Sequence, residues 1–241
     1  MTSLVKAISA CLVFSLGVFS APSSAEEPVL AASIGGQAIS LPPIEGYIEA
    51  SRISAPLVEV MKGFVPSSNR LLAAYLTEAD AGLLRNGEEP GMAQYVMLQT
   101  VRTVETVEMT RDFFSEVKDV LKSNLSFDEG LSEQMNEVLE KEQQATVERN
   151  EFIKSFDSST PTLLAMGDET EDSFAFTLML DVAIDTDYGL EKYKMVYETV
   201  ALNAAGKIVY IYVYDVLDKG DEIANVQSLG QSIKKAIFAA N

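Results

Sequence analysis

The stretch YKMVYETVALNAAGKIVYIYVYDV, residues 193–216, decides the fold. Two runs of alternating side chains, 193–203 and 207–216, flank the short segment Ala204-Ala205-Gly206. Glycine tolerates the positive φ angle that tight hairpin turns demand, and β-branched and aromatic residues are enriched in strands. The stretch therefore predicts two antiparallel strands joined by a tight turn.

Another strand and a helix are predicted on either side of this hairpin. Residues 173–185 carry apolar side chains at every second position, which is the period of a strand. After the hairpin, apolar residues recur at steps of three and four, the period of a helix that is buried along one side. These residues are Ile223, Val226, Leu229, Ile233 and Ile237.

The N-terminal half is predicted to mix strands with a short helix. Pro42-Pro43 interrupts a strand pattern, which suits an edge strand because proline cannot donate to the ladder. A helix is predicted over 55–63, where proline near the start and glycine at the end mark the two boundaries. Two strands follow, over 69–80 and 93–106.

Residues 110–156 predict a long helical pair in the middle of the chain. Apolar side chains recur at helical steps over 113–125 and again over 131–156, where the opposite face carries many acids. A protruding coiled coil is one alternative, but Glu142 and Arg149 interrupt the apolar stripe. We therefore expect an amphipathic helix packed against the rest of the protein.

Taken together, these elements predict a single α+β domain. Its centre is a mostly antiparallel sheet covered by helices, with the helical pair at about 110–156 inserted mid-chain. A split into two domains at residues 110–160 is the alternative. No linker rich in proline, glycine or serine divides the chain, which favours the single domain.

The order of elements resembles the Mog1/PsbP-like α/β/α sandwich. The resemblance covers residues 39–104 and 174–239, and it is clearest in the ending of hairpin strands followed by one amphipathic helix. The helical pair would be an elaboration of that plan. The resemblance implies a non-catalytic accessory or binding protein, although a fold does not fix a function.

The N-terminus has the layout of a secretory signal. Lys6 precedes an apolar run, and Ser23 and Ala25 occupy the small-residue positions that a signal peptidase needs. The only cysteine, Cys11, lies inside the apolar run, whereas a lipoprotein would place it at the end of that run. We expect cleavage near Ala25, a periplasmic or secreted protein, and no stable membrane insertion.

Composition excludes several classes of chemistry from residues 26–241. Removal of residues 1–25 takes away one lysine and no acid, so 17 basic residues face 36 acidic ones and the net charge is −19. Nucleic acid is not expected as a partner, because phosphate backbones are bound by lysine and arginine. Without histidine and cysteine, the usual nucleophilic triads and the common zinc, copper, haem and iron–sulfur sites are excluded.

Tyrosine side chains provide the first candidate ligand site. Alternation along a strand places Tyr210, Tyr212 and Tyr214 on one face, opposite the aliphatic residues between them. Tyr193 and Tyr197 lie on the facing strand and extend the same face. This surface is predicted to bind a flat ligand, a sugar or an apolar side chain. The alternative is that the rings pack beneath a helix.

Acidic residues after the hairpin provide a second candidate site, for calcium. Calcium takes six to eight oxygen ligands in flexible geometry. The stretch DVLDKGDE offers Asp215, Asp218, Asp221 and Glu222, and DVAIDTDYGLE offers a similar group that ends at Glu191. Neither stretch matches an EF-hand loop. Turn formation and favourable placement in the first turn of a helix are the alternative explanation.

The sequence therefore predicts an exported, non-catalytic binding or accessory protein of the bacterial cell envelope. Its partner, a protein or a small molecule, is not specified by any motif. Two alternatives remain, a carboxylate-based hydrolase of a sugar-like substrate and a calcium-stabilised module. A hydrolase would need two acids facing each other in a cleft beside Tyr210 or Tyr212.

Overall fold

A computed structural model describes residues 29–88, 90–125, 129–187 and 189–241, with the backbone alone over 129–136. The predicted signal segment, residues 1–25 with Cys11, lies outside the described residues. In the described part of the chain, no helix is both long and apolar enough to cross a membrane.

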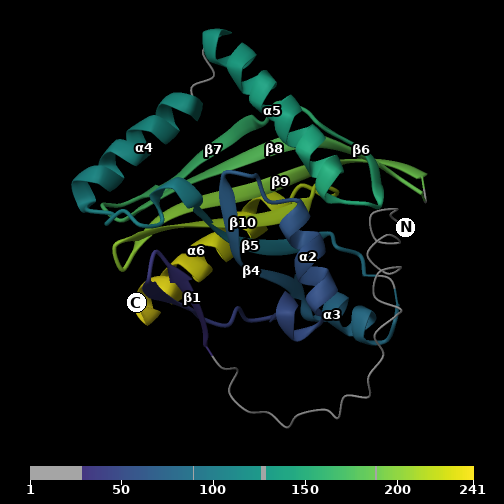
Figure 1. The fold of residues 1–241 in the computed structure, drawn as a ribbon, viewed down its shortest axis with the longest axis horizontal. Helices are drawn as coiled ribbons and strands as arrows, with labels where there is room; N and C mark the ends of the chain where they lie inside the picture. Colours follow the sequence, from purple (N-terminus) through teal and green to yellow (C-terminus); the bar gives the residue numbers. More distant parts are fainter. Residues whose placement is uncertain (1–28, 89, 126–128, 188) are drawn as a thin grey trace.

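One 8-stranded sheet forms the centre of the molecule (Figure 1), and every strand pair in it is antiparallel. This confirms the predicted α+β class. The spatial order is β3-β4-β5-β10-β9-β8-β6, and β7 pairs with β8 beside β6. In chain order these strands are β3 (Tyr47–Glu49), β4 (Asn69–Thr77), β5 (Gln94–Val101), β6 (Ile153–Ser158), β7 (Thr162–Glu169), β8 (Ser173–Thr186), β9 (Gly189–Ala204) and β10 (Lys207–Val216).

The predicted hairpin is the middle of this sheet. Strands β9 and β10 pair from Lys207 opposite Ala204 to Val216 opposite Met195. The turn between them has positive φ angles at both central residues, 49° at Ala205 and 75° at Gly206, as a type I′ turn requires. The glycine was predicted from sequence, whereas the strained alanine beside it was not.

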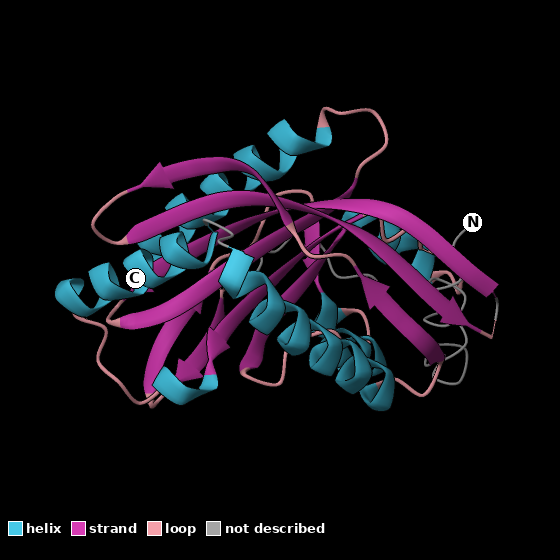
Figure 2. Cartoon of the chain, turned by 90° about the horizontal axis from the view of Figure 1, so that it is seen from above, coloured by secondary structure: helices cyan, strands magenta, loops and turns pink. Residues whose placement is uncertain are grey.

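One face of the sheet is covered by α6 (Glu222–Ala240) and by a separate hairpin, β1 (Leu30–Ile34) with β2 (Gln37–Leu41). Figure 2 shows the sheet between helices on its two sides. Val209, Ile211 and Val213 of β10 are fully buried on this side. The predicted helix after the hairpin, with one buried side, is confirmed.

The opposite face carries the remaining helices. They are α2 (Ala55–Gly63), α3 (Glu78–Arg85), α4 (Arg111–Leu125) and α5 (Glu129–Arg149), with short 3-10 turns η1 (Ala50–Arg52) and η2 (Arg102–Val104). The fully buried Phe114 of α4 packs against Tyr210 and Ala201 of the sheet. The helical pair inserted mid-chain is therefore confirmed, and it is packed on the sheet (Figure 1).

The predicted extension of the second long helix to Phe156 is wrong. The helix α5 ends at Arg149, and residues 153–158 form β6 instead. The buried Asn150 ends the helix, because its side chain donates 2.7 Å to the Thr146 carbonyl, which the next helical N–H would otherwise use. Phe156 is half-buried and stands opposite Ile184 of β8.

Three further elements were not predicted. The small-residue segment before Gln37 forms β1, residues 162–169 form β7, and the strand predicted to run to residue 80 ends at Thr77, where α3 begins. Thr77 caps that start, because its hydroxyl accepts 3.1 Å from the Asp80 N–H and donates 2.8 Å to the Asp80 carboxylate. The sequence contained this signal.

Candidate functional site

A cavity of about 630 Å³ lies on the sheet face opposite α6. Its volume falls within the range of small-molecule sites, roughly 300–1,000 Å³. The floor comes from β5, β8, β9 and β10, and the walls come from α2 and the loop that precedes β5. Described residues that line it include Met61, Phe64, Gly91, Met92, Tyr95, Met97, Gln99, Phe156, Leu180, Val182, Ile184, Glu191, Lys192, Tyr193, Met195, Tyr197, Tyr212, Tyr214 and Val216.

Stacked tyrosines form the floor of the cavity. Tyr214 stands opposite Tyr95 of β5 and opposite Tyr197 of β9 in the sheet register. The ring centroids are 4.7 Å apart for Tyr214 and Tyr95, and 5.4 Å apart for Tyr214 and Tyr197. Tyr212 continues the stack at 6.1 Å from Tyr214. Because side chains alternate along each strand, these rings all lie on one face.

The phenols of this floor are held neutral. Burial raises the pKa of Tyr95, Tyr197, Tyr212 and Tyr214 well above the ordinary value of 10.0. Each phenol therefore keeps its proton even well above pH 7. The four residues are only half-buried by area, since the surface that they keep faces the cavity.

Methionine and phenylalanine side chains make up much of the remaining wall. Four methionines in the wall are buried: Met61 of α2, Met92 of the loop before β5, Met97 of β5 and Met195 of β9. The sulfur of Met195 lies 3.9 Å from the Tyr95 hydroxyl, a weak hydrogen bond. Unbranched, polarizable methionines adapt to ligands of different shape. The wall therefore suits an apolar ligand without fixing its outline.

A hydrogen-bonded loop holds one side of the cavity in place. The carboxylate of Asp80 accepts from the backbone N–H of Gly91 at 2.6 Å and of Met92 at 3.3 Å. Met92 has a φ angle of 48°, a left-handed conformation that is uncommon for a residue with a side chain. Because Asp80 is itself fixed in the first turn of α3, the loop is attached to a regular element.

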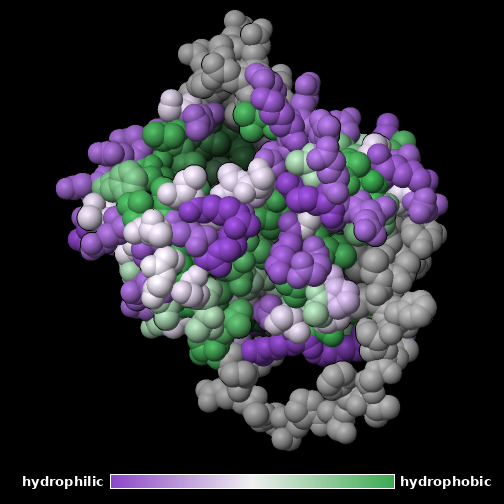
Figure 3. Space-filling view, viewed as in Figure 1, coloured by the Kyte–Doolittle hydropathy of each residue, from purple (hydrophilic) through white to green (hydrophobic). Residues whose placement is uncertain are grey.

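Polar groups in the lining are few. Gln99 is buried, and its side-chain oxygen accepts 2.9 Å from Asn69, which fixes the amide. Among the described residues of the lining, Glu191 is the one carboxylate and Lys192 the one basic side chain. Figure 3 shows that hydrophobic residues also gather in a hollow between α4 and α5 on this face.

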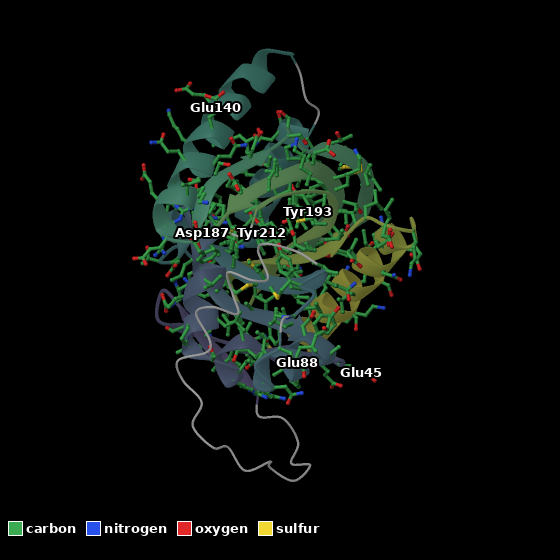
Figure 4. All side chains as sticks on the ribbon, turned by 90° about the vertical axis from the view of Figure 1, so that its right-hand side faces the viewer. Glu45, Glu88, Glu140, Asp187, Tyr193 and Tyr212 are labelled. Carbon is green, nitrogen blue, oxygen red and sulfur yellow. The ribbon has the colours of Figure 1, made fainter. Side chains whose placement is uncertain are left out.

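The structure brings four of the five predicted tyrosines to one cavity, and ligand binding by them stays a prediction. Tyr193, Tyr197, Tyr212 and Tyr214 line the cavity, and Figure 4 shows Tyr193 and Tyr212 inside the molecule, whereas the acids it labels lie toward the outside. Tyr210 stacks on Tyr212, with the ring centroids 6.1 Å apart, but it does not line the cavity. It is 8% exposed and packs with Met109 and Phe114 under α4, where burial raises its pKa to about 12.

Sequence reasoning missed the other walls of the cavity. Tyr95, Phe64 and Phe156 lie far apart in the chain and meet only through the order of the strands. The period-two pattern around Tyr95 was the one available signal, since it predicted which residues share a face of β5.

In the acidic stretch after the hairpin, the carboxylate of Glu222 is hydrogen-bonded to backbone N–H groups. Glu222 accepts from the N–H groups of Asp218, Lys219 and Gly220 at 3.2, 2.8 and 2.6 Å, and these bonds lower its pKa to about 2. Asp218 and Asp221 are exposed. Asp215 is buried on the α6 face of the sheet. Over the described ranges, no three acidic, histidine or cysteine side chains are grouped closely enough to hold a metal ion.

A different cavity, of about 570 Å³, lies between α6 and the segment around Tyr47, and Asp215 is hydrogen-bonded to one of its lining residues, Gln94. The Asp215 carboxylate accepts 2.8 Å from the Gln94 amide, and the Gln94 oxygen accepts from the Tyr47 hydroxyl. Burial is the main cause that raises the pKa of Asp215, and the charge of Glu222 adds to it. Tyr47 and Gln94 line this second cavity.

The hydrolase alternative requires a pair of facing carboxylates. In the described lining of the tyrosine cavity, Glu191 has no second acid beside it. Tyr210, the other position at which such a pair was sought, is buried under α4. The pair of facing acids that such a hydrolase needs is thus not found in the described lining.

Comparisons with known proteins return a likeness of fold. No protein-family model matches the chain, and a search of curated proteins finds no match. Among solved structures it is similar to a point mutant of the protein Mog1, at 14% identity over 86% of this chain and 94% of that chain, with a TM-score of 0.32. It is also similar to the Saccharomyces cerevisiae Ran-binding protein Mog1p, at 12% identity over 88% and 93%, with a TM-score of 0.29. The group is the one that the order of elements resembles, and nothing about the site follows from so loose a superposition.

Proposed function

We propose that this chain is an exported, non-catalytic binding protein that holds a small, predominantly apolar molecule in the tyrosine-lined cavity. The cavity itself carries the proposal, because it is a largely apolar space of about 630 Å³ with stacked rings as its floor and methionines in its walls. Concave sites of this size with a mainly apolar and aromatic lining are where proteins bind small molecules, and burial of an apolar ligand there would remove its surface from water.

Non-catalytic action is the second part of the proposal. The chain has no histidine, its only cysteine is Cys11, and the described lining offers one carboxylate. Robust turnover of any substrate in a broad hydrolase screen, lost on replacement of one carboxylate, would overturn this part.

Export to the bacterial envelope is the third part, and it rests on the signal-like N-terminus. Recovery of the protein from the envelope of an expressing bacterium, followed by mass spectrometry of the intact chain, tests it. We expect a mature form that begins near Glu26. A chain that still begins with Met1 would contradict export by this route.

A neutral fluorescent probe, N-phenyl-1-naphthylamine, tests the binding function. We expect saturable binding to the wild-type chain that raises the melting temperature, because a ligand of the native state alone stabilises that state. In the variant Val216→Trp, the indole fills the cavity at the end of β10, and we expect affinity to fall about tenfold or more.

The matched control is Val120→Trp, which makes the same change at a side chain that is 58% exposed on α4. The chain contains no tryptophan, so each variant also gains a single fluorescent reporter that shows it is folded. Equal probe affinity in the wild-type chain and in a folded Val216→Trp, or no binding by the wild-type chain, would refute the proposed function.

A further inference from the structure

We propose that the ligand of the tyrosine-lined cavity is a neutral molecule with an apolar body and a hydrogen-bond acceptor, of which the carbonyl oxygen of an aromatic ketone is the simplest example. The inference rests on the proposed function and deepens it, since it assigns a chemical class to the occupant of the same cavity. Two features of the lining carry it: the hydroxyl ends of the stacked tyrosine rings, and the small number of acceptors among the other lining side chains.

The tyrosine rings stand side by side on the sheet. Tyr95, Tyr214 and Tyr197 come from the adjacent strands β5, β10 and β9. The ring centroids of Tyr95 and Tyr214 are 4.7 Å apart, which is close to the spacing of neighbouring strands, about 4.8 Å, and those of Tyr214 and Tyr197 are 5.4 Å apart. Rings at this spacing cover one another's faces. The stack therefore presents to the cavity the outer ends of the rings, which carry the hydroxyls.

These hydroxyls find few acceptors in the protein. The Tyr95 hydroxyl donates 3.9 Å to the sulfur of Met195, and a thioether is only a weak acceptor. Within the described ranges of the chain, no hydrogen bond joins the hydroxyls of Tyr193, Tyr197 or Tyr214 to another residue. All three residues line the cavity, so their hydroxyls are available to a ligand.

The three phenols act as donors over the ordinary pH range. Burial is the largest cause that raises the pKa of Tyr193, Tyr197 and Tyr214, so each keeps its proton. A donor that is removed from water and left without an acceptor costs more free energy than one hydrogen bond gains. A ligand that displaces water from these hydroxyls therefore binds best when it brings an oxygen that accepts in place of that water.

Acceptor side chains in the described lining are few and have partners in the chain. Two side chains there carry a carbonyl or carboxylate oxygen, Gln99 and Glu191. The Gln99 oxygen accepts 2.9 Å from the Asn69 amide, and Glu191 has a partner within the chain. The Gln99 amide nitrogen donates to the Met97 sulfur at 3.7 Å, again a weak acceptor, and Lys192 adds a further donor. The lining thus complements a ligand whose polar atoms are acceptors.

The charge of the protein favours a neutral acceptor over an anionic one. The full chain carries a net charge of −18, and a field of this sign lowers the concentration of anions near the protein. A carboxylate would also lose its hydration against apolar and aromatic side chains. A carbonyl oxygen accepts from the same phenols at a smaller cost of desolvation.

The test compares 9-fluorenone with fluorene, two planar molecules of nearly the same shape that differ by a carbonyl in place of a methylene group. Each competes with the neutral naphthylamine probe in a fluorescence titration. Burial alone would favour fluorene, which is the more apolar of the two. We expect fluorenone to bind about fivefold more tightly, the order that one net hydrogen bond provides. We expect fluorene-9-carboxylate, which adds a charge, to bind more weakly than fluorenone.

Variants identify the origin of the preference. The double variant Tyr197→Phe/Tyr214→Phe keeps both stacked rings and removes two hydroxyls, so we expect fluorenone to lose its preference while the affinity for fluorene does not fall. The matched control is Tyr210→Phe, which makes the same change at a ring of β10 that does not line the cavity and should keep the preference. The infrared carbonyl stretch of bound fluorenone gives a second readout. It should lie at lower wavenumber in the wild-type chain than in the double variant, because a hydrogen bond to the oxygen weakens the C=O bond.

The outcomes separate the two proposals. If the naphthylamine probe and fluorene bind but fluorenone is not preferred, or if the double variant and Tyr210→Phe behave alike, the acceptor inference fails and the apolar binding function stands. Tighter binding of the carboxylate than of fluorenone would overturn the choice of a neutral ligand. If neither the naphthylamine probe nor any of the three fluorene compounds binds, both proposals fail together.

Discussion

The ring of Tyr95 stacks on the ring of Tyr214 across the β5–β10 pair, with the centroids 4.7 Å apart and the planes at 22°. The two residues are directly opposite in the antiparallel register, which fixes the stack. Tyr214 also stacks on Tyr197 of β9 and on Tyr212 of its own strand. Its ring therefore contacts tyrosine rings from β5, β9 and β10, and these contacts hold the floor of the cavity together.

Truncation of Tyr214 should destabilise the protein and enlarge the cavity. We expect Tyr214→Ala to lower the free energy of unfolding in urea by about 3–5 kcal/mol, as for other large aromatic side chains removed from a core. Tyr214→Phe keeps the stacked ring and should cost less than about 1.5 kcal/mol. Equal losses in the two variants would show that the ring contacts are not the source of stability.

Gly230 allows α6 to approach the sheet, and a methyl group there should be destabilising. A Cβ at this position would lie 3.0 Å from Cγ of Glu198 and 3.3 Å from Cγ2 of Val200. Neither neighbour can move easily, because Val200 is fully buried and the Glu198 carboxylate is fixed by a 2.6 Å bond from Thr177. We expect Gly230→Ala to lower the free energy of unfolding by about 1–3 kcal/mol despite the better helix propensity of alanine.

The control for this prediction is Gly82→Ala in α3, where an added Cβ meets no atom within 4 Å. Here only helix propensity changes, and we expect a gain of about 0.5–1 kcal/mol in urea unfolding. Stabilisation by both substitutions would mean that α6 shifts away from the sheet at no cost.

The central hairpin and the last helix were predictable because their signals are local. Alternation over 207–216 and the turn glycine Gly206 specify strand, turn and face within a few residues. The end of α5 was not predictable from periodicity, since Phe152 and Phe156 continue the helical spacing. In the structure Phe152 lies just before β6 and Phe156 lies within it. Residues 153–158 form a strand rather than a helix because Asn150 ends the helix and because the apolar side chains that follow are buried against the sheet, which is a tertiary effect.

The candidate site divides in the same way. Alternation predicted that Tyr212 and Tyr214 share a face, whereas the separation of Tyr210 from them depends on where α4 lies over that face. The spacing of side chains along a strand predicts which residues share one face of the sheet. Which of these residues a helix covers depends on contacts between segments that are distant in the sequence.

Asp80 should control the order of the loop that closes one side of the cavity. Asp80→Asn keeps one oxygen for the N–H groups of Gly91 and Met92, but it removes the negative charge that strengthens these bonds and the second oxygen, which accepts from the Thr77 hydroxyl. We expect it to lower the free energy of unfolding by about 1–3 kcal/mol and to weaken the neutral probe several-fold. Hydrogen exchange at these two amides should accelerate. In the control Asp112→Asn, an exposed acid in the first turn of α4, neither amide should change.

Calcium binding by the acids after the hairpin stays a prediction that a melting experiment can decide. If Asp215, Asp218, Asp221 and Glu222 bound the ion, calcium would raise the melting temperature, chelator would lower it, and Glu222→Gln would remove the response. Because Glu222 already accepts three backbone N–H bonds, we expect equal melting curves with calcium and with chelator. A rise of several degrees with calcium would instead support the calcium-stabilised module.

Glu222 should make the stability of the protein depend on pH in the acid range. Three backbone N–H bonds lower its pKa from 4.5 to about 2, so the folded state favours the carboxylate more than the unfolded state does. A lowered pKa contributes stability that is fully present above the unfolded value and is lost as pH falls through the folded value. The wild-type chain should therefore be more stable than Glu222→Gln near neutral pH, and the difference in urea midpoint should shrink as pH falls from about 5 to about 2. Asp218→Asn removes one charge from the same loop without removing these bonds, so it should not reproduce that pH dependence. A difference between the wild-type chain and Glu222→Gln that stays constant over this range would show that the bonds do not depend on ionisation.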